Sequence, residues 1–192
     1  MKATEHGRLV IISGPSGAGK TTVVRRLMET CGLPLVLSVS ATTRPPRPGE
    51  RDGVDYHFLT AEDFARRREA GDFLESFEVY GRGYWYGTLR QEVTTSLALG
   101  KWVVLEIDVQ GMRAVQRQFP DSITIFVRPE SLEELERRLR GRGTESEETL
   151  RRRLDVARRE WQSAREYQHD VVNQSVASAA EEICQRLRSH GT

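Results

Sequence analysis

The sequence predicts a three-layer α/β/α fold with a central parallel sheet. Two observations support this prediction. Short runs of apolar and β-branched residues alternate with longer segments of helical periodicity, and the short runs are apolar throughout rather than at every second position. Strands of this kind are typical of a parallel sheet that helices cover on both faces. The length of 192 residues suits one domain with a substantial core.

Apolar periodicity, glycines and capping residues set the limits of the expected elements. Ser131 with Glu134, and Thr144 with Glu147, form two capping boxes, and each predicts the start of a helix. The expected strands are residues 8–13, 35–40, 73–80, 84–87, 101–108, 122–127 and 170–173. The expected helices are residues 21–31 and 60–71, one after each capping box, and one from about residue 176.

Residues 41–90 interrupt the alternation of strands and helices. Three prolines between residues 41 and 55 rule out a regular helix, so this stretch is expected to be a functional or a disordered loop. The predicted organisation is a single domain, with a core at about 1–40, 91–140 and 165–192. An inserted subdomain of mixed strands is expected at about 41–90 and a helical lid at about 141–164.

Composition argues against several functional classes. The net charge is +1, so the chain is no polycation for nucleic acid. No apolar run reaches the roughly 18 to 20 residues of a membrane helix, and the N-terminus does not resemble a signal peptide, so a cytoplasmic location is expected. The four histidines lack metal-ligand spacing, and Cys31 and Cys184 form no CxxC unit. We therefore expect neither a structural metal site nor a disulfide.

A phosphate-binding loop follows the first expected strand. The stretch from Gly14 to Thr21 matches G-x-x-x-x-G-K-[ST]. Its glycines let backbone N–H groups approach phosphates closely, and the helix that follows directs its N-terminal dipole at the same anion. Lys20 is placed for the β- and γ-phosphates, and Thr21 for Mg²⁺. The expected ATP-binding residues of this loop are Gly14, Pro15, Ser16, Gly17, Ala18, Gly19, Lys20 and Thr21.

A second group of residues predicts a phosphate monoester as the acceptor. Arg44 and Arg47 lie three residues apart in the proline-rich stretch, where guanidinium groups can bind a phosphate in bidentate fashion. Tyr56 and residues 84–86 add hydroxyl groups that can bind the same anion.

With these motifs in place, the sequence resembles the guanylate kinase family over residues 9–188. The resemblance rests on five ordered motifs, which are the phosphate loop, Ser-Val-Ser-x-Thr-Thr-Arg-x-x-Arg-x-Gly-Glu, Tyr-Gly-Thr, Ile-Asp-x-Gln-Gly and Arg-Leu-x-Gly-Arg-Gly. It implies a nucleoside monophosphate kinase of purine metabolism that transfers the γ-phosphoryl group of ATP, with Mg²⁺, to GMP or dGMP.

The resemblance also implies roles for individual residues. The acceptor site is expected to comprise Ser40, Arg44, Arg47, Tyr56, Glu75, Tyr86, Thr88 and Asp108. Arg138 and Asn173 are expected to join the ATP site, and Lys20, Arg44, Arg142 and Arg153 are the expected catalytic residues. Glu75 can accept from the N1–H and N2–H₂ groups of guanine, while the hydroxyls of Ser40 and Thr88 can donate to O6.

Several alternatives stay open at the level of sequence. Asp108 could serve guanine, or Mg²⁺ through water. Tyr84 and Tyr86 could exchange roles, because their turn is about two residues longer than is usual in the family, and Arg153 adjoins two further arginines. The rival functions are a non-catalytic binding module, which usually has a degraded phosphate loop, and a kinase for another small phosphate ester.

Overall fold

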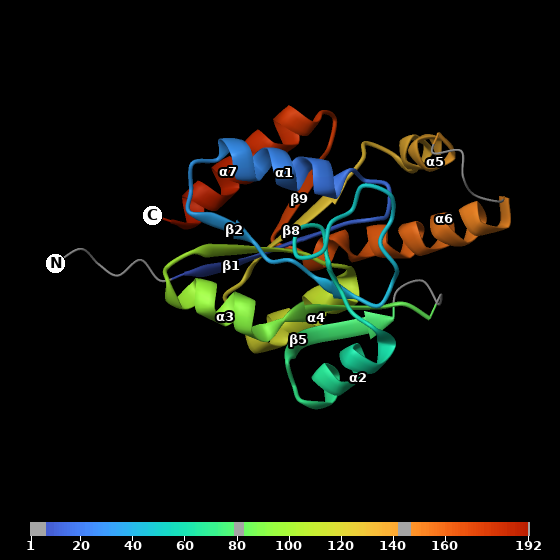
Figure 1. Ribbon diagram of the computed structural model, residues 1–192. Coiled ribbons are helices and arrows are strands. Elements are labelled where there is room, and N and C mark those ends of the chain that lie inside the picture. Colours follow the sequence, from blue (N-terminus) through green and yellow to red (C-terminus); the bar gives the residue numbers. More distant parts are fainter. Residues whose placement is uncertain (1–6, 79–82, 142–146, 192) are drawn as a thin grey trace. The chain divides into compact units, whose positions relative to one another are not determined.

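The computed structural model describes residues 7–78, 83–141 and 147–191. Figure 1 shows the elements of the chain, coloured along the sequence. The chain forms two compact units, each discontinuous in sequence. The insert unit comprises Met1–Leu9, Pro34–Leu105 and Gln110–Ser122. The phosphate-loop unit comprises Val10–Leu33, Glu106–Val109 and Ile123–Thr192.

Five strands form a sheet in the order β2-β7-β1-β8-β9. They are β1 (Arg8–Ser13), β2 (Leu35–Leu37), β7 (Trp102–Glu106), β8 (Ile123–Arg128) and β9 (His169–Val172). Within the phosphate-loop unit β1 pairs with β8 and β8 with β9, and within the insert unit β2 pairs with β7, all in parallel. β1 and β8 are buried along nearly their whole length. The predicted central parallel sheet is therefore confirmed.

Among the described residues, the phosphate-loop unit contains four α-helices and one short 3-10 helix. They are α1 (Lys20–Thr30), α5 (Leu132–Arg140), α6 (Glu147–Gln162), the short η1 (Ser163–Glu166) and α7 (Val176–His190). The Ser131 hydroxyl accepts a hydrogen bond from the Glu134 backbone at 3.2 Å, as the first capping box predicts. The second capping box begins at Thr144, outside the described residues. Leu135 and Leu139 of α5 pack with Leu150 and Leu154 of α6 in one apolar cluster.

A disulfide joins the residue that follows this unit's first helix to the middle of its last helix. Cys31 and Cys184 are bonded, with their Cα atoms 5.4 Å apart, and α1 and α7 lie side by side (Figure 1). Both cysteines are almost fully buried. The expectation of no disulfide was wrong, because the separation of 153 residues hides a proximity that only the packing of the two helices creates.

The insert unit contains a second, mixed sheet in the order β4-β3-β6-β5. Its strands are β3 (Ala41–Thr42), β4 (His57–Phe58), β5 (Phe73–Glu78) and β6 (Trp85–Leu89). β3 runs parallel to β4, whereas β6 is antiparallel to both β3 and β5. Helix α2 (Ala61–Glu69) packs on this sheet through Phe64, whose ring stacks on Phe73 with centroids 4.5 Å apart. The stretch expected to be a loop thus begins with a short strand.

Two helices of the structure have no counterpart among the expected elements. They are α3 (Arg90–Ala98) and α4 (Val109–Gln118). In α3 the one fully buried side chain is that of Val93, so the sequence shows almost no apolar stripe. In α4 Gly111 lowers the helix propensity near the start. No helix among the described residues is both long and apolar enough to span a membrane.

Candidate active site

The phosphate loop connects β1 to α1 and contains three glycines with positive φ, which are Gly14, Gly17 and Gly19. Gly14 has a φ of 147° and Gly19 a φ of 85°. A Cβ atom at Gly14 would collide with the carbonyl oxygen of Val127, and one at Gly19 would lie 2.7 Å from the side-chain nitrogen of Asn173. The first amide groups of α1 have no acceptor within the helix, so they are available to an anion.

The loop itself positions the ammonium group of Lys20. Its Nζ donates to the carbonyl oxygens of Gly14 at 2.6 Å and Pro15 at 3.1 Å. The charge is therefore held over the glycine-rich segment, where an anion bound by the backbone amides would lie.

Thr21 contacts a carboxylate to which the sequence analysis assigns no role. Its Oγ1 donates to Oε1 of Glu106 at 2.7 Å, and Glu106 is the last residue of β7. Hydroxyl and carboxylate oxygens are ligands that Mg²⁺ prefers. The sequence feature that could have identified Glu106 is its position as an acidic residue at the carboxyl end of a buried parallel strand.

The donor set near Thr21 fits Mg²⁺ bound jointly with a nucleotide. Among the residues that the structure describes, no three His, Cys, Asp or Glu side chains cluster as a metal site. Mg²⁺ usually takes one or two protein ligands and completes its shell with phosphates and water, so a small oxygen set is what such a site requires.

Glu160 of α6 is a buried carboxylate beside the phosphate loop. Burial raises its pKa to about 7, and Asp108 raises it too, while Lys20 and a hydrogen bond from the Ser16 backbone oppose the rise. Its Oε2 atom is buried and has no hydrogen-bond partner in the described structure. Asp108 therefore lies close enough to Glu160 to affect it electrostatically, and both belong to the phosphate-loop unit. The sequence analysis missed Glu160, which is one charge on an arginine-rich helix.

Arg138 and Asn173 hold the loop through its backbone. Both donate to the carbonyl oxygen of Ala18, Asn173 from Nδ2 at 2.8 Å and Arg138 from Nη1 at 3.5 Å. Arg138 also donates to the backbone oxygen of Asn173 at 3.3 Å and to Glu134 at 2.7 Å. Their contact with ATP stays a prediction, whereas their support of the loop is structural.

The register of α6 distinguishes Arg153 from its neighbours. Nη2 of Arg153 donates to Oγ of Ser16 at 2.6 Å, whereas Arg151 and Arg152 are exposed. The structure therefore brings Arg153 to the loop, while its catalytic role stays a prediction. Arg142 lies outside the described residues.

In the insert unit, Arg44 is the centre of a cluster of aromatic and charged groups. Its side chain is 9% exposed and makes two hydrogen bonds of 2.9 Å to the carboxylate of Glu50. Nε donates to the Tyr86 hydroxyl at 3.1 Å, and the guanidinium carbon lies 5.3 Å from the ring centroid of Tyr56 and 5.8 Å from that of Phe58. Burial disfavours the charged form of Glu50, but hydrogen bonds from Arg44 and from the Arg47 backbone outweigh it and lower its pKa.

The two tyrosines that the sequence left interchangeable have different environments. Tyr86 accepts from Arg44, and its ring lies edge-on to that of Tyr56 with centroids 5.9 Å apart. Tyr84 is 36% exposed. The structure thus places Tyr86, and not Tyr84, in the Arg44 cluster. Arg47 is exposed at its edge.

Glu75 and Thr88 are cross-strand partners in β5 and β6. The Thr88 hydroxyl, on a side chain that is almost fully buried, donates to Oε1 of Glu75 at 2.6 Å. A hydroxyl has one hydrogen, so in this arrangement Thr88 orients the carboxylate instead of donating to a base. Ser40 precedes β3, and its carbonyl oxygen accepts from the backbone of His57 at 2.9 Å.

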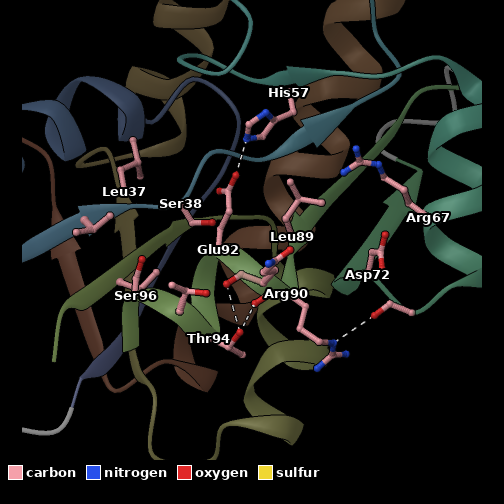
Figure 2. Close-up of a pocket in the computed structure, with 15 residues that line it drawn as sticks. Leu37, Ser38, His57, Arg67, Asp72, Leu89, Arg90, Glu92, Thr94 and Ser96 are labelled. Carbon is pink, nitrogen blue, oxygen red and sulfur yellow. Dashed lines mark hydrogen bonds and ion pairs between the residues drawn. The ribbon is translucent and has the colours of Figure 1, made fainter. Parts of the chain in front are cut away.

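A separate cavity of about 870 Å³ lies in the insert unit. None of the residues expected to bind nucleotide lines it. Figure 2 shows His57 pointing to Glu92 of α3 across this cavity, at 2.7 Å, with Ser38 and Leu89 nearby. Because Leu89 directly follows Thr88 in β6, the two side chains point to opposite faces of the strand. The cavity therefore lies behind the Glu75–Thr88 pair, and we assign it no nucleotide.

Comparison with known proteins identifies the family. The guanylate kinase family model matches residues 6–190. A guanylate kinase from Rhodopirellula baltica is 59% identical over 186 residues, which cover 96% of this chain and 89% of that protein. One from Mycobacterium leprae is 46% identical over 184 residues, covering 96% and 87%. The crystal structure of guanylate kinase from Anaplasma phagocytophilum superimposes with a TM-score of 0.80 at 30% identity, covering 98% of this chain and 88% of that one.

These matches agree with the intact phosphate loop, the Arg44 cluster and the Glu75–Thr88 pair. The chain belongs to the guanylate kinase family.

Proposed function

We propose that this chain transfers the γ-phosphoryl group of ATP to GMP, with ATP bound by the phosphate-loop unit and GMP by the insert unit. The main support comes from β6. Tyr86 and Thr88 are two residues apart, so their side chains share one face of the strand, about 7 Å apart along it. Tyr86 belongs to the cationic Arg44 cluster, and Thr88 orients Glu75. This face of β6 thus lies beside a cation that can bind the phosphate of GMP and beside a carboxylate that can bind its base. The two groups are separated by roughly the length of a nucleotide.

The proposed base specificity follows from the carboxylate. Glu75 can accept from both donors on the N1 and N2 edge of guanine, whereas adenine presents an acceptor at the corresponding position. A site whose buried polar group is left unpaired by the wrong substrate discriminates by about 10⁴ or more. Since Thr88 already donates to Glu75, Ser40 is the hydroxyl proposed for O6.

On the donor side, we propose that Thr21 binds Mg²⁺ directly and that Glu106 orients the Thr21 hydroxyl. Asp108 is proposed to reach the ion through water. When bound, the ion would neutralise charge on the β- and γ-phosphate oxygens. The amides of the loop hold the phosphates, and Lys20 brings its charge to the same group.

The proposed chemistry requires no covalent intermediate. A phosphate oxygen of GMP attacks the γ-phosphorus in line, the bond to the β–γ bridging oxygen breaks, and ADP leaves. Catalysis then consists of positioning and charge stabilisation by Lys20, Arg44, Arg142 and Arg153. Closure of a lid at about 141–164 over a core at 1–40, 91–140 and 165–192 excludes water.

Two further points belong to this proposal. dGMP is proposed as a second acceptor, because the proposed contacts address the phosphate and the base and not the 2′-hydroxyl group. A cytoplasmic location is proposed, because both substrates are intracellular metabolites.

The test is ADP formation from ATP and Mg²⁺ with GMP, AMP, CMP and UMP in parallel, with Lys20→Met as the control. Turnover with GMP alone, abolished in the control, is the expected result. If ATP binds but GMP supports no turnover, the proposal fails and another acceptor or a binding module takes its place.

A further inference from the structure

We propose that Glu50 is a positioning residue of the acceptor site, which fixes Arg44 in one orientation and leaves Arg47 as the main ligand of the acceptor phosphate. This inference rests on the proposed function, since it concerns the site at which GMP is phosphorylated. It gives a role to Glu50, to which none has been assigned so far. It also assigns different roles to Arg44 and Arg47, both of which belong to the expected acceptor site.

The first step is the way in which Glu50 holds Arg44. The two side chains form a fork in which Nη1 and Nη2 each reach one carboxylate oxygen at 2.9 Å. The Glu50 side chain is 19% exposed, so the pair lies mostly out of water. Paired contacts between guanidinium and carboxylate fix direction as well as distance. The pair therefore sets the plane of the Arg44 guanidinium before any substrate arrives.

The second step is a count of the donors left on Arg44. A guanidinium has five N–H groups. Nε donates to Tyr86, Nη1 to Pro45 and Glu50, and Nη2 to Glu50, which uses four. One N–H on Nη2 remains. Arg44 can thus offer a phosphate its charge and one directed hydrogen bond, but no bidentate contact.

The third step concerns Arg47. Its backbone N–H donates to Glu50 at 2.7 Å, whereas in the described structure its exposed guanidinium makes no hydrogen bond. All five of its N–H groups are therefore available. Arg47 can supply the bidentate contact that Arg44 cannot.

A different role for Glu50 has to be weighed, namely that it occupies the phosphate position and is displaced by GMP. The local backbone argues against displacement. Glu50 donates from its own N–H to the Arg47 carbonyl at 3.0 Å while its carboxylate accepts from the Arg47 N–H, so it closes a turn within its own loop.

The two roles predict opposite effects of Glu50→Gln on the KM for GMP. The substitution removes a negative charge beside the place where the phosphate binds, so a displaced carboxylate would predict a lower KM. Loss of positioning predicts a higher KM, because Arg44 then samples several orientations. The sign of the change therefore decides between them.

The experiment measures kcat, the KM for GMP, the KM for ATP and the melting temperature of wild type, Glu50→Gln and Glu50→Asp. Asp63→Asn, which breaks the Arg66–Asp63 pair at 2.6 Å on the surface of the same unit, is the matched control. For Glu50→Gln we expect the KM for GMP to rise about tenfold or more and kcat to fall, because Arg44 is also proposed to stabilise charge in the reaction, with the KM for ATP within about threefold. Glu50→Asp keeps the charge, so its KM for GMP should lie between those of wild type and Glu50→Gln. The control should resemble wild type in all four measurements.

A lower KM for GMP in Glu50→Gln, or a fall in melting temperature with the KM for GMP unchanged, would overturn the proposal. If Glu50→Gln does not fold, Glu50→Asp decides between the two roles of Glu50. Its side chain is shorter, so an unchanged KM for GMP in this variant would contradict the positioning role. Failure of the proposed function is a separate result, since wild type itself would then show no turnover with GMP.

Discussion

Arg44 and Arg47 have the same chemistry in the sequence but different surroundings in the fold. Arg44 is buried against Tyr56 and bonded to Glu50, whereas Arg47 is exposed. A lysine keeps the charge of an arginine but lacks the planar fork and the ability to stack. The cost of each arginine-to-lysine change should therefore differ between the two positions.

We expect Arg44→Lys to lower the stability of the insert unit as well as kcat/KM for GMP, because the Glu50 carboxylate loses its paired donors. Arg47→Lys should raise the KM for GMP by about tenfold while leaving the melting temperature unchanged, since only the proposed contact with the acceptor phosphate is altered. Steady-state kinetics and thermal unfolding of both variants measure this. Equal loss of stability in the two variants would contradict the assigned environments.

The Glu75–Thr88 pair makes a prediction about base choice. Glu75→Gln replaces one acceptor atom by a donor, so the N1 and N2 donors of guanine can no longer both be satisfied. We expect kcat/KM for GMP to fall by about 10² or more. We expect no fall in kcat/KM for AMP, so the ratio of kcat/KM for GMP to kcat/KM for AMP becomes smaller.

Thr88→Val tests the supporting contact. It removes the hydroxyl that orients Glu75 without changing the carboxylate, and should give a smaller loss in the same assay, about tenfold. A full loss of GMP turnover in Thr88→Val, or an unaltered GMP to AMP ratio in Glu75→Gln, would show that this pair does not recognise the base.

Motifs predict the residues of the candidate site but not their partners in the fold. The sequence identifies Lys20, Arg44 and Glu75 because their residue type and spacing recur with the chemistry. It gave no role to Glu106 or Glu160, since what matters there is which side chain lies within hydrogen-bond distance across the fold. The contribution of Thr88 differs for the same reason, because its hydroxyl is already used by Glu75.

At the scale of elements, α6 makes two contacts with one residue of the phosphate loop. Arg153 donates to the Ser16 side chain, and the Ser16 backbone interacts with Glu160 seven residues further along the helix. Two turns of helix separate these positions, so they lie on the same face. A basic and an acidic side chain of α6, Arg153 and Glu160, thus both interact with the phosphate loop.

Glu160 makes stability depend on pH in an unusual direction. Its pKa is about 7 in the folded chain and 4.5 in the reference state, so between these values the folded state binds the extra proton. Stability contributed by this group is therefore present at low pH and decreases as the pH rises from about 4.5 to 7. Above that range the carboxylate is charged in both states, and its burial is unfavourable.

We expect Glu160→Gln to flatten this dependence, because the amide does not titrate. Relative to wild type, the variant should gain about 3 kcal/mol in free energy of unfolding between pH 5 and pH 8. Denaturant unfolding at the two pH values, without nucleotide, measures the gain, with the exposed Glu29→Gln as the control. A pH dependence identical in Glu160→Gln and wild type would contradict a buried, titrating Glu160.

Elements were predictable from sequence where a local signal marks them. β1 has the predicted limits, and α5 begins at the predicted capping box because Ser131 and Glu134 form a contact within one turn. α3 was not predicted, since it buries little of its surface and includes β-branched Val93, Thr94 and Thr95. Its place in the fold depends on contacts distant in sequence, such as that between Glu92 and His57.

At the scale of the whole molecule, the disulfide ties α1 to α7 across 153 residues of chain. Closing so long a loop restricts the unfolded chain, and removing such a bond typically costs about 2–5 kcal/mol. We expect the double variant Cys31→Ala and Cys184→Ala to lose stability of this order under oxidising conditions. Dithiothreitol should destabilise wild type but not the variant.

Thiol titration of unfolded wild type, prepared without reductant, provides the check. Two reactive thiols per chain would show that the bond does not form in solution. Because reducing compartments keep cysteines as thiols, the same measurement on protein isolated under trapping conditions also bears on the proposed cytoplasmic location.

The discontinuity of the two units has a consequence for synthesis on the ribosome. The insert unit needs no residue beyond Ser122, whereas the phosphate-loop unit needs β9 and α7, the last elements to be made. Domains generally fold in the order in which their segments emerge. A nascent chain arrested near residue 150 therefore already has the segments that are proposed to hold GMP. Its phosphate loop has been translated earlier, but the unit to which this loop belongs still lacks β9 and α7.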